Sequence, residues 1–113
     1  MKIYHNNRCS KSRSGLEILN SSKQDFEVVD YINNPLSEKE IKDLLKKLDF
    51  TPIQLIRKNE SVWKENYKGK TLSDAEIIKA MSKHPKLIER PIVVKGDKAV
   101  LGRPPENINV LLD

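Results

Sequence analysis

Cys9 is the residue with the greatest capacity for chemistry in this sequence, and it is the only cysteine. It follows the apolar pair Ile3-Tyr4 and precedes residues that favour the start of a helix. We therefore expect Cys9 at a strand-to-helix junction, where helical N–H groups carry partial positive charge. Such a position lowers the pKa of a thiol and predicts a reactive thiolate.

The residues around this cysteine are polar or basic, which argues against a buried, inert thiol. Arg8, Ser10 and Lys11 are its close neighbours in the chain. The charge of Arg8, of Arg13 or of a protonated His5 would lower the thiol pKa further.

The spacing around Cys9 separates three kinds of cysteine chemistry. A dithiol oxidoreductase requires a second cysteine at position 12, where the sequence has Ser12. A phosphate-loop phosphatase, or an arsenate reductase built on that fold, requires an arginine at position 15, which is Gly15; Arg13 is too early. A zinc site lacks ligands, because only two histidines accompany the one cysteine, and we expect no metal. A single-thiol mechanism completed by an external thiol remains.

The arginines are scarce, whereas the lysines are spread along the whole chain. Besides Arg8 and Arg13 there are only Arg57, Arg90 and Arg103, each beside a break in the apolar pattern. The planar guanidinium group suits bidentate contacts with oxyanions. These three arginines are therefore better candidates for anion binding than the lysines.

Composition indicates one folded domain over residues 1–113, with 33% charged and 37% hydrophobic residues. The net charge of +5 does not indicate nucleic-acid binding, because acidic residues interleave with the lysines and aromatic residues are few. No apolar segment approaches the roughly 20 residues of a membrane span, and none resembles a signal peptide. The single cysteine fits a reducing compartment, so we expect a cytoplasmic protein. We also expect a monomer.

The elements that must position these residues follow from hydrophobic periodicity and capping signals. We expect strands at 2–5, 26–32, 91–94 and 99–101, the last two forming a hairpin. A helix capped by Ser10 or Ser12 follows the first strand, and a helix with Ile108, Leu111 and Leu112 on one side ends the chain. The order predicts an α/β, thioredoxin-like fold with a mixed four-stranded sheet.

A helical insertion is expected between strands 2 and 3, at about residues 34–85. Capping boxes begin at Ser37 and Ser73, each with a flanking pair of apolar residues. Thr51-Pro52 starts a short helix that would place Arg57 just past its end. We interpret Trp63 and Tyr67 as packing residues.

The sequence as a whole resembles the glutaredoxin-coupled arsenate reductase family, and is closest to its arsenate reductase-like subgroup. The similarity lies in residues 5–13, in Leu55-Ile56-Arg57-Lys58-Asn59, in residues 84–94 and in Gly102-Arg103-Pro104-Pro105-Glu106. Order and spacing match across essentially the whole chain. Asn7 departs from the family pattern, which usually has proline there.

The resemblance implies a role for each candidate residue. It implies that Cys9 is the nucleophile, with His5 helping to keep it ionised and Arg8 and Ser12 in support. It implies that Arg57, Arg90 and Arg103 bind one oxyanion near the thiol, and that Pro91 matches the cis-proline of thioredoxin-like folds.

The implied reaction reduces arsenate to arsenite without a bound cofactor. Cys9 forms a thiol-arsenate ester, glutathione as co-substrate reduces the arsenic, and glutaredoxin removes the glutathione left on the cysteine. Two alternatives share the fold: a monothiol oxidoreductase acting on another substrate, and a transcription regulator that binds RNA polymerase. The second normally uses Cys-x-x-Cys as its sensor, which Ser12 interrupts.

Overall fold

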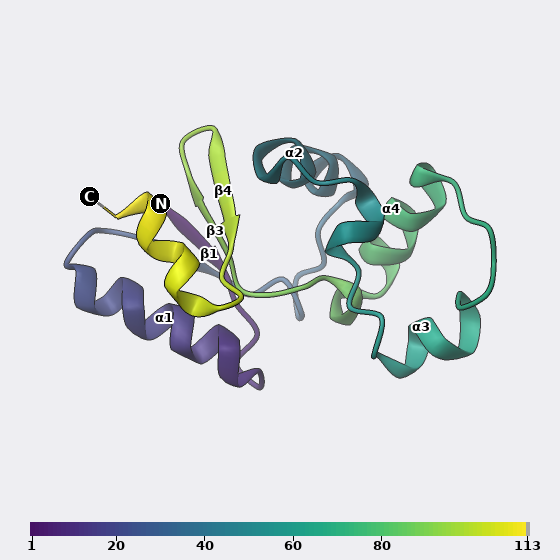
Figure 1. The fold of residues 1–113 in the computed structure, drawn as a ribbon, viewed down its shortest axis with the longest axis horizontal. Coiled ribbons are helices and arrows are strands. Elements are labelled where there is room, and N and C mark those ends of the chain that lie inside the picture. Colours follow the sequence, from purple (N-terminus) through teal and green to yellow (C-terminus); the bar gives the residue numbers. More distant parts are fainter. Residues whose placement is uncertain (113) are drawn as a thin grey trace. The chain divides into compact units, whose positions relative to one another are not determined.

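The computed structural model describes residues 1–112 and groups the chain into two compact units. The first unit contains Met1–Asn33 and the chain from Arg90 onward, and the second contains Asn34–Glu89. The second unit is therefore inserted, in sequence, between two segments of the first. Figure 1 follows the chain through both units.

The first unit is built on a four-stranded mixed sheet, as the sequence predicts. Strands β1 (Lys2–Tyr4), β2 (Glu27–Val29), β3 (Ile92–Lys95) and β4 (Lys98–Leu101) lie in the order β2-β1-β3-β4. β1 is parallel to β2, whereas β1–β3 and β3–β4 are antiparallel. The register places Tyr4 opposite Ile92, so the segment that follows β1 runs beside the segment that precedes β3.

Two helices pack against this sheet through a small apolar core. They are α1 (Ser10–Ser22) and the 3₁₀ helix η3 (Pro105–Leu111), which lie side by side in Figure 1. The buried core residues come from both helices and from the two central strands: Ile3, Leu19, Val93, Ile108 and Leu111. This packing fixes where α1 begins, and hence where Cys9 lies.

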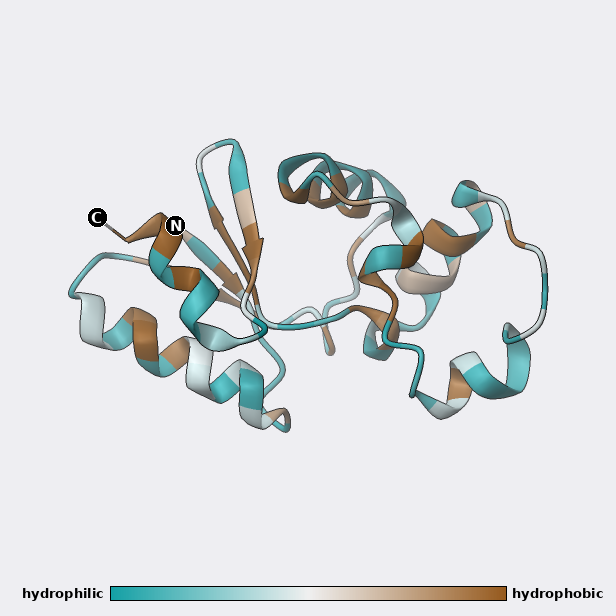
Figure 2. Cartoon of the chain, in the orientation of Figure 1, coloured by the Kyte–Doolittle hydropathy of each residue, from teal (hydrophilic) through white to brown (hydrophobic). Residues whose placement is uncertain are grey.

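The second unit is helical. It contains α2 (Glu38–Leu48), η1 (Pro52–Leu55), α3 (Ser61–Asn66), α4 (Asp74–Lys83) and η2 (Pro85–Leu87). Helices α2 and α4 pack together. Figure 2 shows hydrophilic residues alternating with hydrophobic ones along α2. The buried side chains on these two helices recur with helical spacing: Ile41, Leu44, Leu45, Leu48, Ile77, Ile78, Ala80 and Met81.

Both predicted capping boxes are present in this unit. The hydroxyl of Ser37 accepts from the backbone N–H of Glu40, and the Glu40 carboxylate accepts from the N–H of Ser37. Ser73 and Glu76 form the same pair of hydrogen bonds at the start of α4. Trp63 is buried and stacks on Tyr67 with ring centroids 5.6 Å apart, in keeping with a packing role.

Two local predictions were wrong, whereas the predicted last helix is present and has 3₁₀ geometry. The second strand covers only Glu27–Val29, because the Asp30 carboxylate accepts from the backbone N–H and side-chain amide of Asn33 and forms a turn. Neither Ser10 nor Ser12 caps α1, whose N-cap residue is Cys9.

Among residues 1–112, no helix has the length and apolar character needed to cross a membrane.

Candidate active site

Cys9 occupies the N-cap position of α1, and its side chain makes no capping hydrogen bond. Partial burial tends to raise the pKa of the thiol and is the largest single influence on it. The backbone N–H groups of Ser12 and Lys11, followed by the charges of Arg90 and Arg103, together outweigh burial and lower the pKa below its ordinary value. The N–H groups in the first turn of α1 thus stabilise a thiolate at Cys9, the position where other helices have a capping side chain.

The loop before α1 is held by hydrogen bonds around Asn6. Its carbonyl accepts from the N–H of Cys9 at 3.0 Å, and its side-chain oxygen accepts from the N–H of Arg8 at 3.0 Å. The carbonyl of Asn7 accepts from Nη1 of Arg13 at 3.0 Å. These contacts secure the loop although Asn7 replaces the proline usual in the resembling family. Asn6 was not among the predicted site residues, although asparagine side chains often accept hydrogen bonds from the backbone N–H two residues on.

Ser12 is fully buried and joins this loop to α1. Its Oγ accepts from the backbone N–H of Asn6 at 3.0 Å and lies 2.7 Å from Nδ1 of His5. Ser12 therefore contacts two candidate site residues. Its backbone N–H lowers the pKa of the Cys9 thiol, and its hydroxyl forms a hydrogen bond with the His5 ring.

Burial lowers the pKa of His5, although contacts with Asn7, Ser12 and Asp30 act in the opposite direction. The imidazole is therefore neutral at neutral pH, which does not favour the expectation that a protonated His5 keeps Cys9 ionised. The 2.7 Å hydrogen bond between Nδ1 of His5 and Oγ of Ser12 holds the ring against the loop, and the tautomer of the imidazole sets which of the two groups donates.

Arg90 and Arg103 are the arginines whose charges act most strongly on Cys9. Arg90 is 4% exposed and Arg103 is half-buried. Each precedes a cis-proline, Pro91 or Pro104, so the predicted match of Pro91 to a cis position is observed. The arginines next to Cys9 in the sequence act on its thiol less than expected. Arg8 is exposed, and the Arg13 side chain donates to the carbonyl of Asn7 in the loop.

Pro91 packs against two glycines that belong to different parts of the first unit. A Cβ atom on Gly15 would lie 2.8 Å from Cγ of Pro91, and one on Gly102 would lie 2.9 Å from the same atom. The N–H of Gly102 also donates to the carbonyl of Pro91 at 2.8 Å. This contact holds the Arg90 and Arg103 segments close to α1, and it explains a glycine inside a helix.

Arg57 belongs to the second unit, just past η1 as predicted. Its Nε lies 3.2 Å from the Glu60 carboxylate, and its Nη1 is buried without a hydrogen-bond partner among residues 1–112. Its backbone N–H donates to the carbonyl of Leu87 at 2.7 Å. The role of Arg57 in anion binding stays a prediction.

Taken together, residues of the first unit form a depressed-pKa thiol beside two arginines and the N–H groups of a helix start. Oxyanions are bound by such N–H groups and guanidinium groups, and the thiolate is the nucleophilic form of cysteine. The arrangement is suited to nucleophilic attack by Cys9 on the central atom of a bound oxyanion.

Known proteins resemble this chain over nearly its whole length. A model of the ArsC family matches residues 4–111. The uncharacterized protein YfgD of Escherichia coli is 46% identical over 110 residues, covering 96% of this chain and 92% of YfgD. An arsenate reductase of Haemophilus influenzae is 41% identical over 112 residues, covering 97% of each chain. The structure of an arsenate reductase from Vibrio cholerae superposes with a TM-score of 0.92 at 39% identity, covering 100% of this chain and 98% of that one.

Proposed function

Because this chain belongs to the ArsC family, we propose that it is an oxidoreductase that reduces arsenate to arsenite, with Cys9 as the nucleophile. The observation that carries the proposal is the lowered pKa of Cys9, produced against the effect of burial by helical N–H groups and by Arg90 and Arg103. The relatives named as arsenate reductases support the choice of substrate.

In the first step, arsenate binds to the N–H groups of the first turn of α1 and to the guanidinium groups of Arg90 and Arg103. The Cys9 thiolate attacks arsenic and forms the sulfur–arsenic bond, while one arsenate hydroxyl takes up a proton and leaves as water. In this proposal the same arginines then bind the oxygens left on the ester.

In the second step, the thiolate of glutathione attacks Cys9 Sγ and forms a disulfide. The electron pair of the sulfur–arsenic bond leaves with arsenic, which is thereby reduced from the pentavalent to the trivalent state and departs as arsenite. Glutaredoxin then attacks the glutathione sulfur and releases Cys9 as a thiolate. A chain with one cysteine requires such outside thiols, and a reducing cytoplasm supplies them.

The decisive experiment measures arsenite formed by the purified chain with arsenate, glutathione and glutaredoxin. Turnover is expected for the wild type and not for Cys9→Ser, and omission of glutaredoxin should limit the reaction to a single turnover. Arsenite formation no faster than with Cys9→Ser would refute the proposal. Mass spectrometry after treatment with glutathione disulfide gives a second measurement, in which a Cys9 adduct without arsenate turnover would indicate a thiol oxidoreductase with another substrate.

Substitution of the arginines tests their part in anion binding. Arg103→Gln should raise KM for arsenate more than it raises KM for glutathione, because the charge that it removes faces the oxyanion. Arg57→Gln measures whether the predicted third arginine contributes. An unchanged KM for arsenate in Arg103→Gln would contradict the assignment.

A further inference from the structure

Arg103 lies in the irregular segment between β4, which ends at Leu101, and η3, which begins at Pro105. Neither a strand ladder nor a helix fixes the backbone at this position, so other hydrogen bonds must do so. The charge of Arg103 nevertheless acts on the Cys9 thiol. The contacts that hold the backbone at Arg103 therefore decide where this charge lies in the candidate active site.

On one side, the Arg103 segment is fixed by a buried contact with the start of β3. The N–H of Gly102 donates to the carbonyl of Pro91 at 2.8 Å, and both residues are buried. Gly102 also lies against Ile108 of η3, because a Cβ atom added to it would be 3.0 Å from Cδ1 of Ile108. This side of the segment belongs to the apolar packing of the first unit.

On the other side, the segment is held by the side chain of Asn107. Its Nδ2 donates to the carbonyl of Leu101 at 3.4 Å and to the carbonyl of Arg103 at 3.2 Å. A primary amide has two N–H donors, so one group can serve both carbonyls. One carbonyl precedes the Arg103 Cα atom and the other follows it, so the amide bridges the chain on both sides of this residue.

The backbone of Asn107 is itself well placed for this contact. Its N–H donates to the carbonyl of Pro104 at 3.0 Å, and the next residue, Ile108, is fully buried in the core. The Asn107 side chain is exposed, in contrast to the buried contact of Gly102. Loss of the amide should therefore loosen the Arg103 segment without unfolding the unit.

We propose that Asn107 is a positioning residue, whose amide fixes the backbone from which the Arg103 guanidinium group reaches the candidate active site. Asn107 acts through Arg103 and takes no part in the reaction itself. The assignment deepens the proposed function, because it concerns an arginine that is proposed to bind the oxyanion. Its first measurement needs no arsenate and does not rest on that function.

The first measurement is the rate of Cys9 alkylation by iodoacetamide as a function of pH. Asn107→Ala removes the amide but keeps the backbone hydrogen bond of residue 107. The thiolate fraction at neutral pH should fall by about two- to threefold, the low end expected for solvent-exposed hydrogen bonds.

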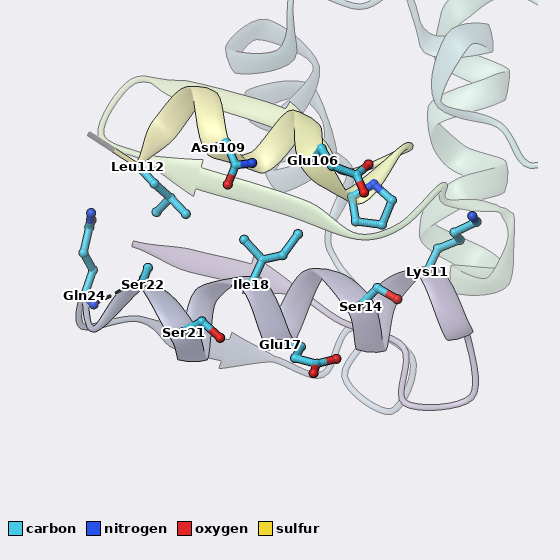
Figure 3. Close-up of a pocket in the computed structure, with 11 residues that line it drawn as sticks. Lys11, Ser14, Glu17, Ile18, Ser21, Ser22, Gln24, Glu106, Asn109 and Leu112 are labelled. Carbon is cyan, nitrogen blue, oxygen red and sulfur yellow. Dashed lines mark hydrogen bonds between the residues drawn. The ribbon is translucent and has the colours of Figure 1, made fainter.

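Asn109→Ala is the matched control, because it removes the same kind of side chain from the same helix. Asn109 is exposed and lines a surface groove between η3 and α1 in Figure 3. Its side chain forms no hydrogen bond among residues 1–112. The alkylation profile of Asn109→Ala should match that of the wild type.

A double variant separates positioning of Arg103 from a general structural effect. In the Arg103→Gln background the charge is already absent, so adding Asn107→Ala should not lower the thiolate fraction further. The second measurement is the steady-state KM of the single variant. Asn107→Ala should raise KM for arsenate by about two- to threefold and change KM for glutathione less.

An Asn107→Ala profile that matches Asn109→Ala would overturn the proposal, as would an equal fall in the wild-type and Arg103→Gln backgrounds. Loss of stability on urea unfolding without a change in alkylation would also overturn it, because the contact would then be structural only. The expected alkylation pattern in a chain that does not turn over arsenate would support the role of Asn107 and refute the proposed function. The two proposals therefore fail separately.

Discussion

Helix α1 begins differently from α2 and α4. The two helices of the second unit start with capping boxes at Ser37 and Ser73 and have acidic residues in the first turn, Glu38 and Glu40 in α2. Helix α1 starts at Cys9 without a side-chain cap, and its first turn contains no acidic residue. The positive end of α1 is therefore not neutralised by its own side chains.

The difference separates a helix start suited to stability from one suited to stabilising a thiolate or another anion. A serine cap with a following glutamate satisfies two N–H groups and contributes of the order of 1 kcal/mol. At α1 the N–H groups of Lys11 and Ser12 act on the cysteine sulfur and lower its pKa. The first turn of α1 thus lacks this stabilisation and retains an electrostatic environment that favours an anion.

Replacing the cysteine by a better cap gives the largest expected effect. Cys9→Ser should reduce arsenate turnover by more than about 10³-fold, because it removes the nucleophile. Serine is a preferred N-cap residue, so the same variant should gain about 0.5–1 kcal/mol in free energy of unfolding. Activity assays and urea denaturation at neutral pH measure both changes, and a loss of stability would contradict the comparison.

The stability difference should also depend on pH. The folded-state pKa of Cys9 is below its unfolded value, so the wild type gains stability as pH rises from the folded to the unfolded value. That contribution is fully present above the unfolded pKa and is lost as pH falls through the folded pKa. Cys9→Ser should lack it.

Removing the buried hydroxyl of Ser12 should lower the free energy of unfolding by about 2 kcal/mol. Ser12→Ala leaves the N–H of Asn6 and Nδ1 of His5 without the contacts at 3.0 and 2.7 Å. Thermal or urea unfolding measures the loss. Ser10→Ala, an exposed residue at the start of the same helix, is the matched control and should change stability little.

Removing one of the distant charges should shift the pH dependence of Cys9 reactivity to higher pH. Arg103 is among the groups that lower the thiol pKa, so Arg103→Gln should raise it and reduce the thiolate fraction at neutral pH. The rate of alkylation by iodoacetamide as a function of pH reports this pKa. Arg8→Gln is the control, and an equal shift in both variants would show that neighbours in sequence matter as much as Arg103.

Removing an ordinary cap gives the smallest expected effect. Ser37→Ala should cost about 1 kcal/mol of stability, because Ser37 and Glu40 exchange two hydrogen bonds at the start of α2. The alkylation profile of Cys9 should not change. A Ser37→Ala variant with normal stability but altered thiol reactivity would reverse the distinction between the two kinds of helix start.

The strand-to-helix junction at Cys9 and the starts of α2 and α4 were predictable because they depend on residues within one helical turn. The four strands and the short helix before Arg57 were also predicted, although the predicted second strand was too long. Its error at α1 is instructive: Ser10 and Ser12 are good capping residues, but packing against the sheet sets the first turn so that Cys9 is the N-cap and Ser12 is buried.

Cys9 is identifiable as the candidate nucleophile from the amino-acid sequence alone, since there is one cysteine, with polar neighbours and no second thiol. Which charges act on its thiol depends on tertiary contacts. Pairing of β1 with β3 and the packing of Pro91 against Gly15 and Gly102 bring Arg90 and Arg103 to Cys9. Electrostatic effects depend on distance in space, and the arginines nearest in sequence are directed to solvent and to the loop instead.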